Sequence, residues 1–439
     1  MFGALWRDLT GEAPGPVEIT GPETVLPGPY RVAAAASMSV AAATLAAAEL
    51  LRLRGIDPGA VSADTRHAAA AFSSEKLVRV DGEPPGDAWA PLSGDYRAAD
   101  GWVRLHCNYP HHAAAVCRAL GVAEDRAAVA SAVAARDAWD VQEAVVAAGG
   151  AAAAMRTREE WLDSAMGRAL DGPLVAQELV GMAPARPLPE SPRPLGGVRV
   201  LDLTHVIAGP VAGRVLAAHG ADVLHIGAAH LPVVHPLVVD TGMGKRSAHL
   251  DLRTEVGRSA LWRLIGSADV VLQSFRPGAL AGLGFTAERL AAARPGIVLV
   301  ELNAWGWEGP WRGRRGFDSL VQMASGIAWG AEEPRPLPVQ ALDHATGWLA
   351  AAAAMVALRN RAVEGGSRRV RLALARTGRW LDGLGRVPGG STVDFSNFLA
   401  ETGSGFGLVR HVTCPGGMVP RPMWTSGPPL PGSAFAEWL

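Results

Sequence analysis

Short apolar runs alternate with stretches of helical periodicity between residues 198 and 302. The apolar runs cover residues 198–203, 221–226, 270–272 and 297–302, and the helical stretches cover 211–219, 255–265 and 286–293. Strands that alternate with helices form a parallel sheet, because each helical crossover returns the chain to the same end of the sheet before the next strand begins. We therefore predict an α/β fold with helices on the sheet and ligands outside the carboxyl ends of the strands.

Prolines mark a boundary between two segments. Residues 184–194 contain five prolines, which cannot continue a helix, so this stretch is predicted to be a linker. It separates residues 1–183 from a second domain, residues 195–381. Residues 382–439 are rich in Gly and Pro and show little periodicity, so we expect a C-terminal arm.

The composition excludes several classes of protein. A formal net charge of −1 gives no general attraction to nucleic acid or to an anionic membrane, so neither is expected as a partner. Three cysteines without CxxC spacing exclude a disulfide framework, and a reducing cytoplasm is the expected location. No export signal is predicted at the start. The apolar run over residues 32–51 is mostly alanine and is predicted to be a packed core helix.

Histidines and cysteines gather in one part of the first segment. Their spacings do not match the usual zinc patterns, so ordinary packing is the preferred interpretation and no metal is predicted. The group comprises His106, Cys107, His111, His112 and Cys117.

Asp343 is the residue with the strongest claim to chemistry. It lies in Leu342-Asp343-His344-Ala345-Thr346-Gly347, just before an alanine-rich helix expected over residues 348–361. A carboxylate at that position either caps the helix, by accepting hydrogen bonds from the first free N–H groups, or acts as a nucleophile. The motifs that precede it favour the nucleophile.

These motifs occur in a fixed order, and together they are far more specific than any one alone. In chain order they are Leu201-Asp202-Leu203-Thr204 with Ala208-Gly209-Pro210, Gly244-Lys245-Arg246-Ser247, Ser274-Phe275-Arg276-Pro277-Gly278, Trp305-Gly306 with Gly309-Pro310, and Arg315-Gly316-Phe317-Asp318. The series covers about residues 197–381 and resembles the class III CoA-transferases, the family of formyl-CoA transferase and carnitine-CoA transferase.

The resemblance implies both a fold and an activity. The fold would be a Rossmann-like parallel sheet in a large domain with a smaller α+β domain. The activity would move CoA from an acyl-CoA thioester to a carboxylic acid, with CoA as substrate and product and no permanently bound cofactor. Asp343 matches the family's covalent nucleophile, which would form an anhydride and then a thioester. Family members are interlocked dimers, so a homodimer is expected.

Other site residues follow from position and from the resemblance. Backbone N–H groups around Gly347 are expected to stabilise the developing oxyanion, which would make Gly347 a second catalytic residue. Local cations and small-residue turns are expected to bind CoA. These residues are Ala208, Gly209, Pro210, Lys245, Arg246, Ser274, Phe275, Arg276, Pro277 and Arg315.

The first segment contains a faint second copy of part of the second. Leu51-Arg52-Leu53-Arg54 aligns with Leu358-Arg359-Asn360-Arg361 at an offset of 307 (358 minus 51), which places Ala36 opposite Asp343. Residues 89–106 resemble the small domain that family members carry after the catalytic domain. A permuted order and a decayed tandem duplication both explain this arrangement.

Two other functions stay open. The α-methylacyl-CoA racemases share the fold but need a histidine and an aspartate on opposite sides of the substrate; here Phe317 occupies the histidine's place, and His344 adjoins Asp343. A non-catalytic CoA-binding or partner-binding protein would explain Ala36. It would also explain why, after residue 226, the chain lacks the acidic residue and arginine that hold the adenine end in family members.

Overall fold

A seven-stranded sheet forms the centre of the computed structural model, which describes residues 1–439. The strand order is β10-β9-β8-β11-β12-β13-β7, and only β7 runs antiparallel to its neighbour. The strands are β7 (Val175–Gly181), β8 (Arg199–Leu203), β9 (Asp222–Gly227), β10 (Arg246–His249), β11 (Val270–Gln273), β12 (Val298–Asn303) and β13 (Ser367–Ala373). The predicted α/β fold is confirmed, and its strand order reverses between β8 and β11, where such sheets bind ligands.

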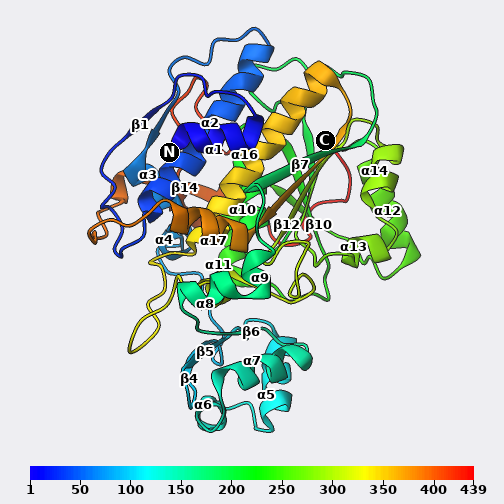
Figure 1. Cartoon of the computed structure of the whole chain (residues 1–439). Coiled ribbons are helices and arrows are strands. Elements are labelled where there is room, and N and C mark those ends of the chain that lie inside the picture. The colour runs from blue at the N-terminus through cyan, green and yellow to red at the C-terminus, as the bar shows by residue number, and fades with distance from the viewer.

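Helices cover both faces of the sheet (Figure 1). On one face, α10 (Ala208–Ala218) and α16 (Ala341–Glu364) share a core with Val200 and Val298. On the other, α12 (Glu255–Ile265) and α14 (Ala287–Ala293) share a core with the neighbouring strand residues Leu201 and Leu299. Successive side chains of a strand point to opposite faces, so strands covered on both sides read as unbroken apolar runs.

Helix α2 (Val32–Leu53) packs along α16. Both helices are long and apolar enough to span a membrane, but 94% and 100% of their most apolar windows are buried inside the protein. Alanine allows the two backbones to approach closely, and the run over residues 32–51 is a core helix, as predicted. The first segment therefore contributes directly to the core around α16.

A smaller α+β unit projects from one end of the molecule (Figure 1). It consists of the antiparallel strands β4, β5 and β6 with three helices, and it has a hydrophobic core of its own. Its elements are β4 (Gly94–Arg97), β5 (Trp102–Leu105), α5 (Pro110–Leu120), α6 (Arg126–Ala134), α7 (Ala138–Ala147) and β6 (Ala152–Ala154). We call it the small domain.

The other elements tie the ends of the chain to the large body. Strand β7 comes from the first segment yet completes the sheet of the second, and the tail forms a hairpin that pairs with β3. The remaining elements are α1 (Phe2–Thr10), β1 (Glu18–Thr20), β2 (Ser62–Asp64), α3 (Thr65–Ala71), α4 (Ser74–Leu77), β3 (Arg79–Val80), α8 (Arg158–Asp163), α9 (Ala165–Arg168), α11 (His235–Thr241), α13 (Ala279–Gly282), α15 (Asp318–Ala324), α17 (Leu374–Gly383), η1 (Ser396–Phe398), β14 (Leu399–Ser404) and β15 (Gly407–Val412).

Two helices begin earlier than the sequence indicates. Helix α10 includes Gly209 and Pro210 in its first turn, where a proline is tolerated because no N–H is needed for an intrahelical hydrogen bond. Helix α16 starts at Ala341 instead of residue 348, so Asp343 lies inside its first turn. The structure therefore corrects the expected start of each helix, and it places Asp343 on the helix itself.

Candidate active site

The start of α16 is capped by a residue from another helix. The Asp318 carboxylate, at the start of α15, accepts hydrogen bonds through Oδ2 from the backbone N–H groups of Leu342 (2.8 Å) and Asp343 (2.9 Å). These are two of the N–H groups that a helix leaves unpaired at its N-terminus. Asp318 therefore does the capping that could have occupied Asp343.

The Asp343 carboxylate is left free. No protein group donates a hydrogen bond to it, the residue is only 7% exposed, and it lines a cavity. A nearly buried carboxylate without a partner is costly, so natural proteins keep one mainly where it has a function. This arrangement favours the nucleophile over the helix cap.

The surroundings of Asp343 disfavour its negative charge. Burial, together with the nearby carboxylates of Asp318 and Glu75, raises the pKa of Asp343 well above its ordinary value. Burial also raises the pKa of Asp318 to about 6. Burial alone would raise the pKa of Glu75, but the charge and hydrogen bond of His344, at 2.9 Å, outweigh it and lower the pKa. The carboxylate most destabilised as an anion is thus the one that faces the cavity.

The cavity beside Asp343 has a volume of about 470 Å³ and lies over the strand-order reversal. The structure brings seven of the ten predicted CoA-binding residues into its wall. They are Ala208, Gly209, Ser274, Phe275, Arg276, Pro277 and Arg315. We call this space the main cavity.

Three arginines in the wall of the main cavity have no acidic partner. Arg276, Arg312 and Arg315 form no ion pair, whereas Arg314 is held by Glu143 at 2.8 Å. Burial and the neighbouring charge of Arg276 lower the pKa of Arg315, which places these two cations near each other. Cations gathered without counter-ions favour an anionic ligand.

The other three predicted CoA-binding residues lie outside the wall of the main cavity. Lys245 is 5% exposed, and its Nζ donates hydrogen bonds to Asp202 Oδ2 and to the Pro210 carbonyl oxygen, both at 2.8 Å. Arg246 is paired with Asp222 at 2.9 Å. Pro210 and Lys245 line a smaller neighbouring cavity. The phosphate role assigned to both cations stays a prediction, and these ion pairs do not support it.

Gly347 is explained by packing. It lies inside α16, and a Cβ atom there would come within 2.5 Å of the Ala208 carbonyl oxygen and 2.8 Å of the Val211 side chain. Only glycine allows α10 and α16 to cross this closely. Its catalytic role stays a prediction.

The small domain contributes residues that the sequence did not assign to the site. Tyr109, His111 and His112, around the start of α5, line the main cavity. Nearby, the ring of His106 stacks on Phe317, with the centroids 3.5 Å apart and the planes at 3°. His111 and His112 stood out in the sequence only as possible metal ligands, and the structure contains no group of three or more residues that could hold a metal ion.

A doubly wound sheet whose switch-point cavity holds a free carboxylate and unpaired arginines suits an anionic ligand. The chain belongs to CoA-transferase family III, whose family model matches residues 6–174 and 195–383. Both segments thus match the same family. The class indicated by the motifs is confirmed.

Individual relatives agree with this membership. The chain is 30% identical over 396 residues to an acyl-CoA transferase of Gibberella moniliformis, an alignment that covers 78% of this chain and 69% of the relative. It is 35% identical over 199 residues to a probable fatty acyl-CoA transferase of Mycobacterium tuberculosis, which covers 42% of this chain and 50% of the relative. The Gibberella alignment is longer than either segment, so it crosses the linker and shows that this relative has the same segment order.

Solved structures of similar proteins also align with only part of this chain. A crystal structure of the Mycobacterium tuberculosis protein is 33% identical and has a TM-score of 0.41, covering 44% of this chain and 57% of that chain. A CAIB/BAIF family protein from Brucella suis is 27% identical with a TM-score of 0.40, covering 49% of this chain and 65% of that one. The chain spans from half to about two thirds of the length of these proteins.

Proposed function

We propose that this protein transfers CoA from an acyl-CoA thioester to a carboxylic acid, with Asp343 as the covalent nucleophile. One observation carries the proposal. The only carboxylate in the wall of the main cavity, Asp343, is buried and free of hydrogen bonds, and the same wall holds three unpaired arginines. The arginines suit the phosphates of CoA, and the carboxylate suits attack on the thioester.

The reaction would proceed through two kinds of covalent intermediate. An Asp343 oxygen attacks the thioester carbonyl carbon, the C–S bond breaks, and the CoA thiolate leaves a mixed anhydride on Asp343. The thiolate then attacks the Asp343 carbonyl carbon, which releases the donor acid and forms an aspartyl thioester. The acceptor carboxylate attacks that thioester, a second anhydride forms, and the returning thiolate gives the new acyl-CoA and restores Asp343.

The environment of Asp343 suits this chemistry. The raised pKa reflects a carboxylate that is poorly stabilised as an anion, which makes the ionised form a stronger nucleophile once substrate is bound. Although Asp318 caps two of its N–H groups, the positive N-terminal end of α16, a helix of 24 residues, would favour the negative charge that develops there during attack. Burial also limits the access of water to an anhydride.

The contacts of His344 disfavour a racemase. Its ring is fully buried, stacks on Phe72 and bonds Glu75, so it does not reach the main cavity. Phe317, which does line that cavity, cannot transfer a proton. No acid–base partner for Asp343 therefore comes from either position considered in the sequence.

Trapping with hydroxylamine tests the covalent step. The protein is incubated with acyl-CoA donors of two to six carbons, treated with hydroxylamine and analysed by peptide mass spectrometry. We expect a hydroxamate on Asp343 and on no other acidic residue, together with exchange of CoA into an added carboxylic acid. Exchange without modification of Asp343 would rule out this mechanism.

The arginines of the main cavity give a second prediction. Arg315→Gln is expected to raise the KM for acyl-CoA about tenfold, since a hydrogen bond to a charged group contributes roughly 1.5–3 kcal/mol. The ratio of the KM of Arg315→Gln to that of wild type should shrink as salt is added, because screening weakens the contact between Arg315 and acyl-CoA in the wild type. Arg66→Gln, at an exposed arginine without an ion pair, serves as the control. An unchanged KM in Arg315→Gln would remove this residue from the CoA site.

The family resemblance also extends the proposal to a homodimer in the cytoplasm. Light scattering measures the oligomeric state.

A further inference from the structure

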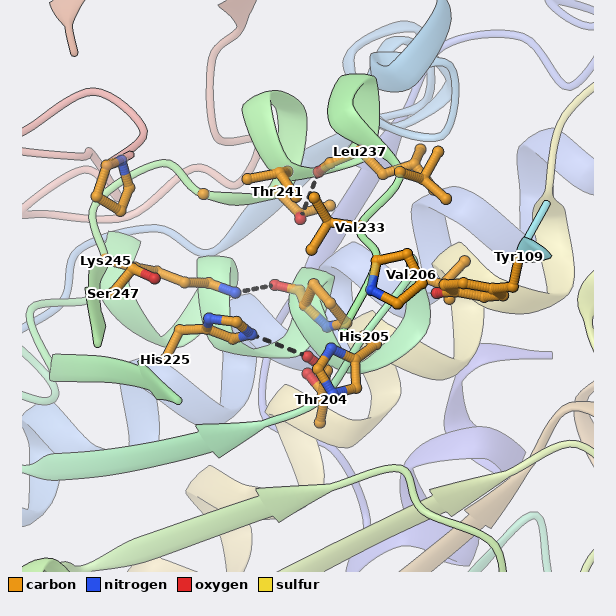
Figure 2. Close-up of a pocket in the computed structure, with 16 residues that line it drawn as sticks. Tyr109, Thr204, His205, Val206, His225, Val233, Leu237, Thr241, Lys245 and Ser247 are labelled. Atoms are coloured by element: carbon orange, nitrogen blue, oxygen red, sulfur yellow. Dashed lines mark hydrogen bonds between the residues drawn. The ribbon is translucent and has the colours of Figure 1, made fainter. Parts of the chain in front are cut away.

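A second, smaller cavity adjoins the main one (Figure 2). Its volume is about 70 Å³, and it shares Tyr109, His205, Val206 and Pro232 with the wall of the main cavity. Val206 has a φ of 72°, which a β-branched residue rarely adopts and which marks a strained segment where the two cavities meet. We call the smaller cavity the side pocket.

Part of the side-pocket wall is aliphatic. This part is made of Val206, Val233, Val234, Leu237 and Val238. Figure 2 shows Leu237 and Val233 above Val206, with Lys245 and His225 to their left. A space of this size holds roughly two water volumes, at about 30 Å³ each, or roughly two to three chain carbons beyond a thioester carbonyl that stays in the main cavity.

Four polar side chains of the side pocket have partners within the protein. Thr241 donates its hydroxyl hydrogen to the Leu237 carbonyl oxygen (2.7 Å), and Thr204 donates to Asp202. The His225 ring bonds the Thr204 carbonyl oxygen at 3.1 Å, and Ser247 accepts a hydrogen bond from the Gly432 N–H at the same distance. The neutral groups still able to bond a polar ligand are the Tyr109 and Ser247 hydroxyls and the His205 ring.

The charge of the side pocket is also neutralised. Lys245 is its only cationic residue other than histidine, and its ammonium group is held by Asp202 and Pro210. Burial, with the charge of His225 nearby, lowers the pKa of His205 to about 4, so this ring is neutral at physiological pH. A carboxylate that entered the pocket would lose its hydration without gaining a free cation, which is strongly unfavourable.

The strand order separates the side pocket from the arginines. The side pocket lies over the segments that follow β8 and β9 and over the start of β10, whereas the unpaired arginines follow β11 and β12. Ala208 and Gly209, in the main cavity with Asp343, come just after Val206 in the chain. A thioester at Asp343 with its phosphates on the arginines would therefore direct its acyl group toward the side pocket.

We propose that the side pocket binds the acyl chain of the donor, and that the donor is a short aliphatic acyl-CoA of about four carbons without a terminal charge. This inference rests on the proposed function. It adds a substrate class: monocarboxylic acyl groups are accepted, and dicarboxylic ones of equal length are rejected.

A pair of donors of equal length tests the substrate class. Butyryl-CoA and succinyl-CoA both carry four carbons, and only succinyl-CoA ends in a carboxylate. We expect kcat/KM at least tenfold higher for butyryl-CoA. Val233→Arg, at a residue that is 51% exposed and therefore tolerant of substitution, should reduce that ratio by supplying a free cation. Val256→Arg, at an 80% exposed position on α12, should leave it unchanged.

Binding separates a failure of this inference from a failure of the proposed function. If no donor supports exchange, the transferase proposal fails, and calorimetry of wild-type protein with the same two thioesters still tests the pocket. Tighter binding of butyryl-CoA, weakened selectively by Val233→Arg, supports the inference. The inference is overturned if the wild-type protein uses succinyl-CoA, or binds it, at least as well as butyryl-CoA.

Discussion

Asp343→Asn is expected to lower the rate of CoA exchange by more than about 10³-fold, as loss of a covalent nucleophile does in other enzymes. Asparagine keeps the shape of the side chain and removes the charged oxygen that attacks the thioester. The fold should be intact, because the Asp343 carboxylate makes no hydrogen bond in the protein and the cap of α16 comes from Asp318. Exchange is measured with a labelled carboxylic acid and an acyl-CoA donor.

The same substitution should stabilise the protein at neutral and alkaline pH. The pKa of Asp343 is raised on folding. The favourable contribution of this side chain to the free energy of unfolding is therefore complete below the unfolded pKa of about 3.9, and it is lost as pH rises through the folded pKa. An asparagine side chain cannot ionise, so the variant does not suffer that loss. Thermal unfolding should therefore show a higher Tm for Asp343→Asn than for wild type at pH 8 and little difference at pH 4. A lower Tm at pH 8 would contradict the raised pKa.

Lys245→Met is expected to destabilise the fold by about 3–5 kcal/mol, because it leaves the Asp202 carboxylate buried without its cation. The ion pair is almost completely enclosed, with side-chain exposures of 3% for Lys245 and 0% for Asp202. Burial alone would raise the pKa of Asp202, but Lys245 outweighs it and lowers the pKa, so the carboxylate stays charged. Denaturant unfolding measures the loss.

Two variants make this test specific. Adding Asp202→Asn to Lys245→Met should restore much of the stability, since asparagine removes the stranded charge and still offers an oxygen to the Thr204 N–H, now 3.0 Å from Asp202. Lys76→Met changes the chain's other lysine, which is exposed, and should cost less than about 1 kcal/mol. A loss in Lys245→Met no larger than that in Lys76→Met would show that the ion pair is not important for stability.

Much of the sheet could be predicted from sequence, because strands buried on both faces form uninterrupted apolar runs. All four predicted runs coincide with β8, β9, β11 and β12. The strands β7, β10 and β13 were missed, because polar and charged residues leave them without an unbroken apolar run. Arg371 of β13, for example, is paired with Glu301 of β12, and a pattern along one strand does not reveal a partner on the next.

The residues of the candidate site were also predicted only in part. Asp343 and the loop around Arg276 were identified because short motifs carry them, and the structure places both in one cavity. The cap from Asp318, the ion pair of Lys245 with Asp202, and the rings from the small domain were not identified. Each depends on contacts between residues far apart in the chain, 25 residues for the cap and 43 for the ion pair. Local spacing carries no signal for them.

The packing of α2 against α16 has a consequence during synthesis. The first of these helices ends at Leu53 and the second begins at Ala341, so 287 residues (54 through 340) leave the ribosome before the partner appears. At about 5–20 residues per second, the alanine-rich surface of α2 stays uncovered for roughly 15–60 seconds. A nascent chain in that interval exposes an apolar helix that chaperones can bind. The position of α16 late in the chain sets how long this exposure lasts.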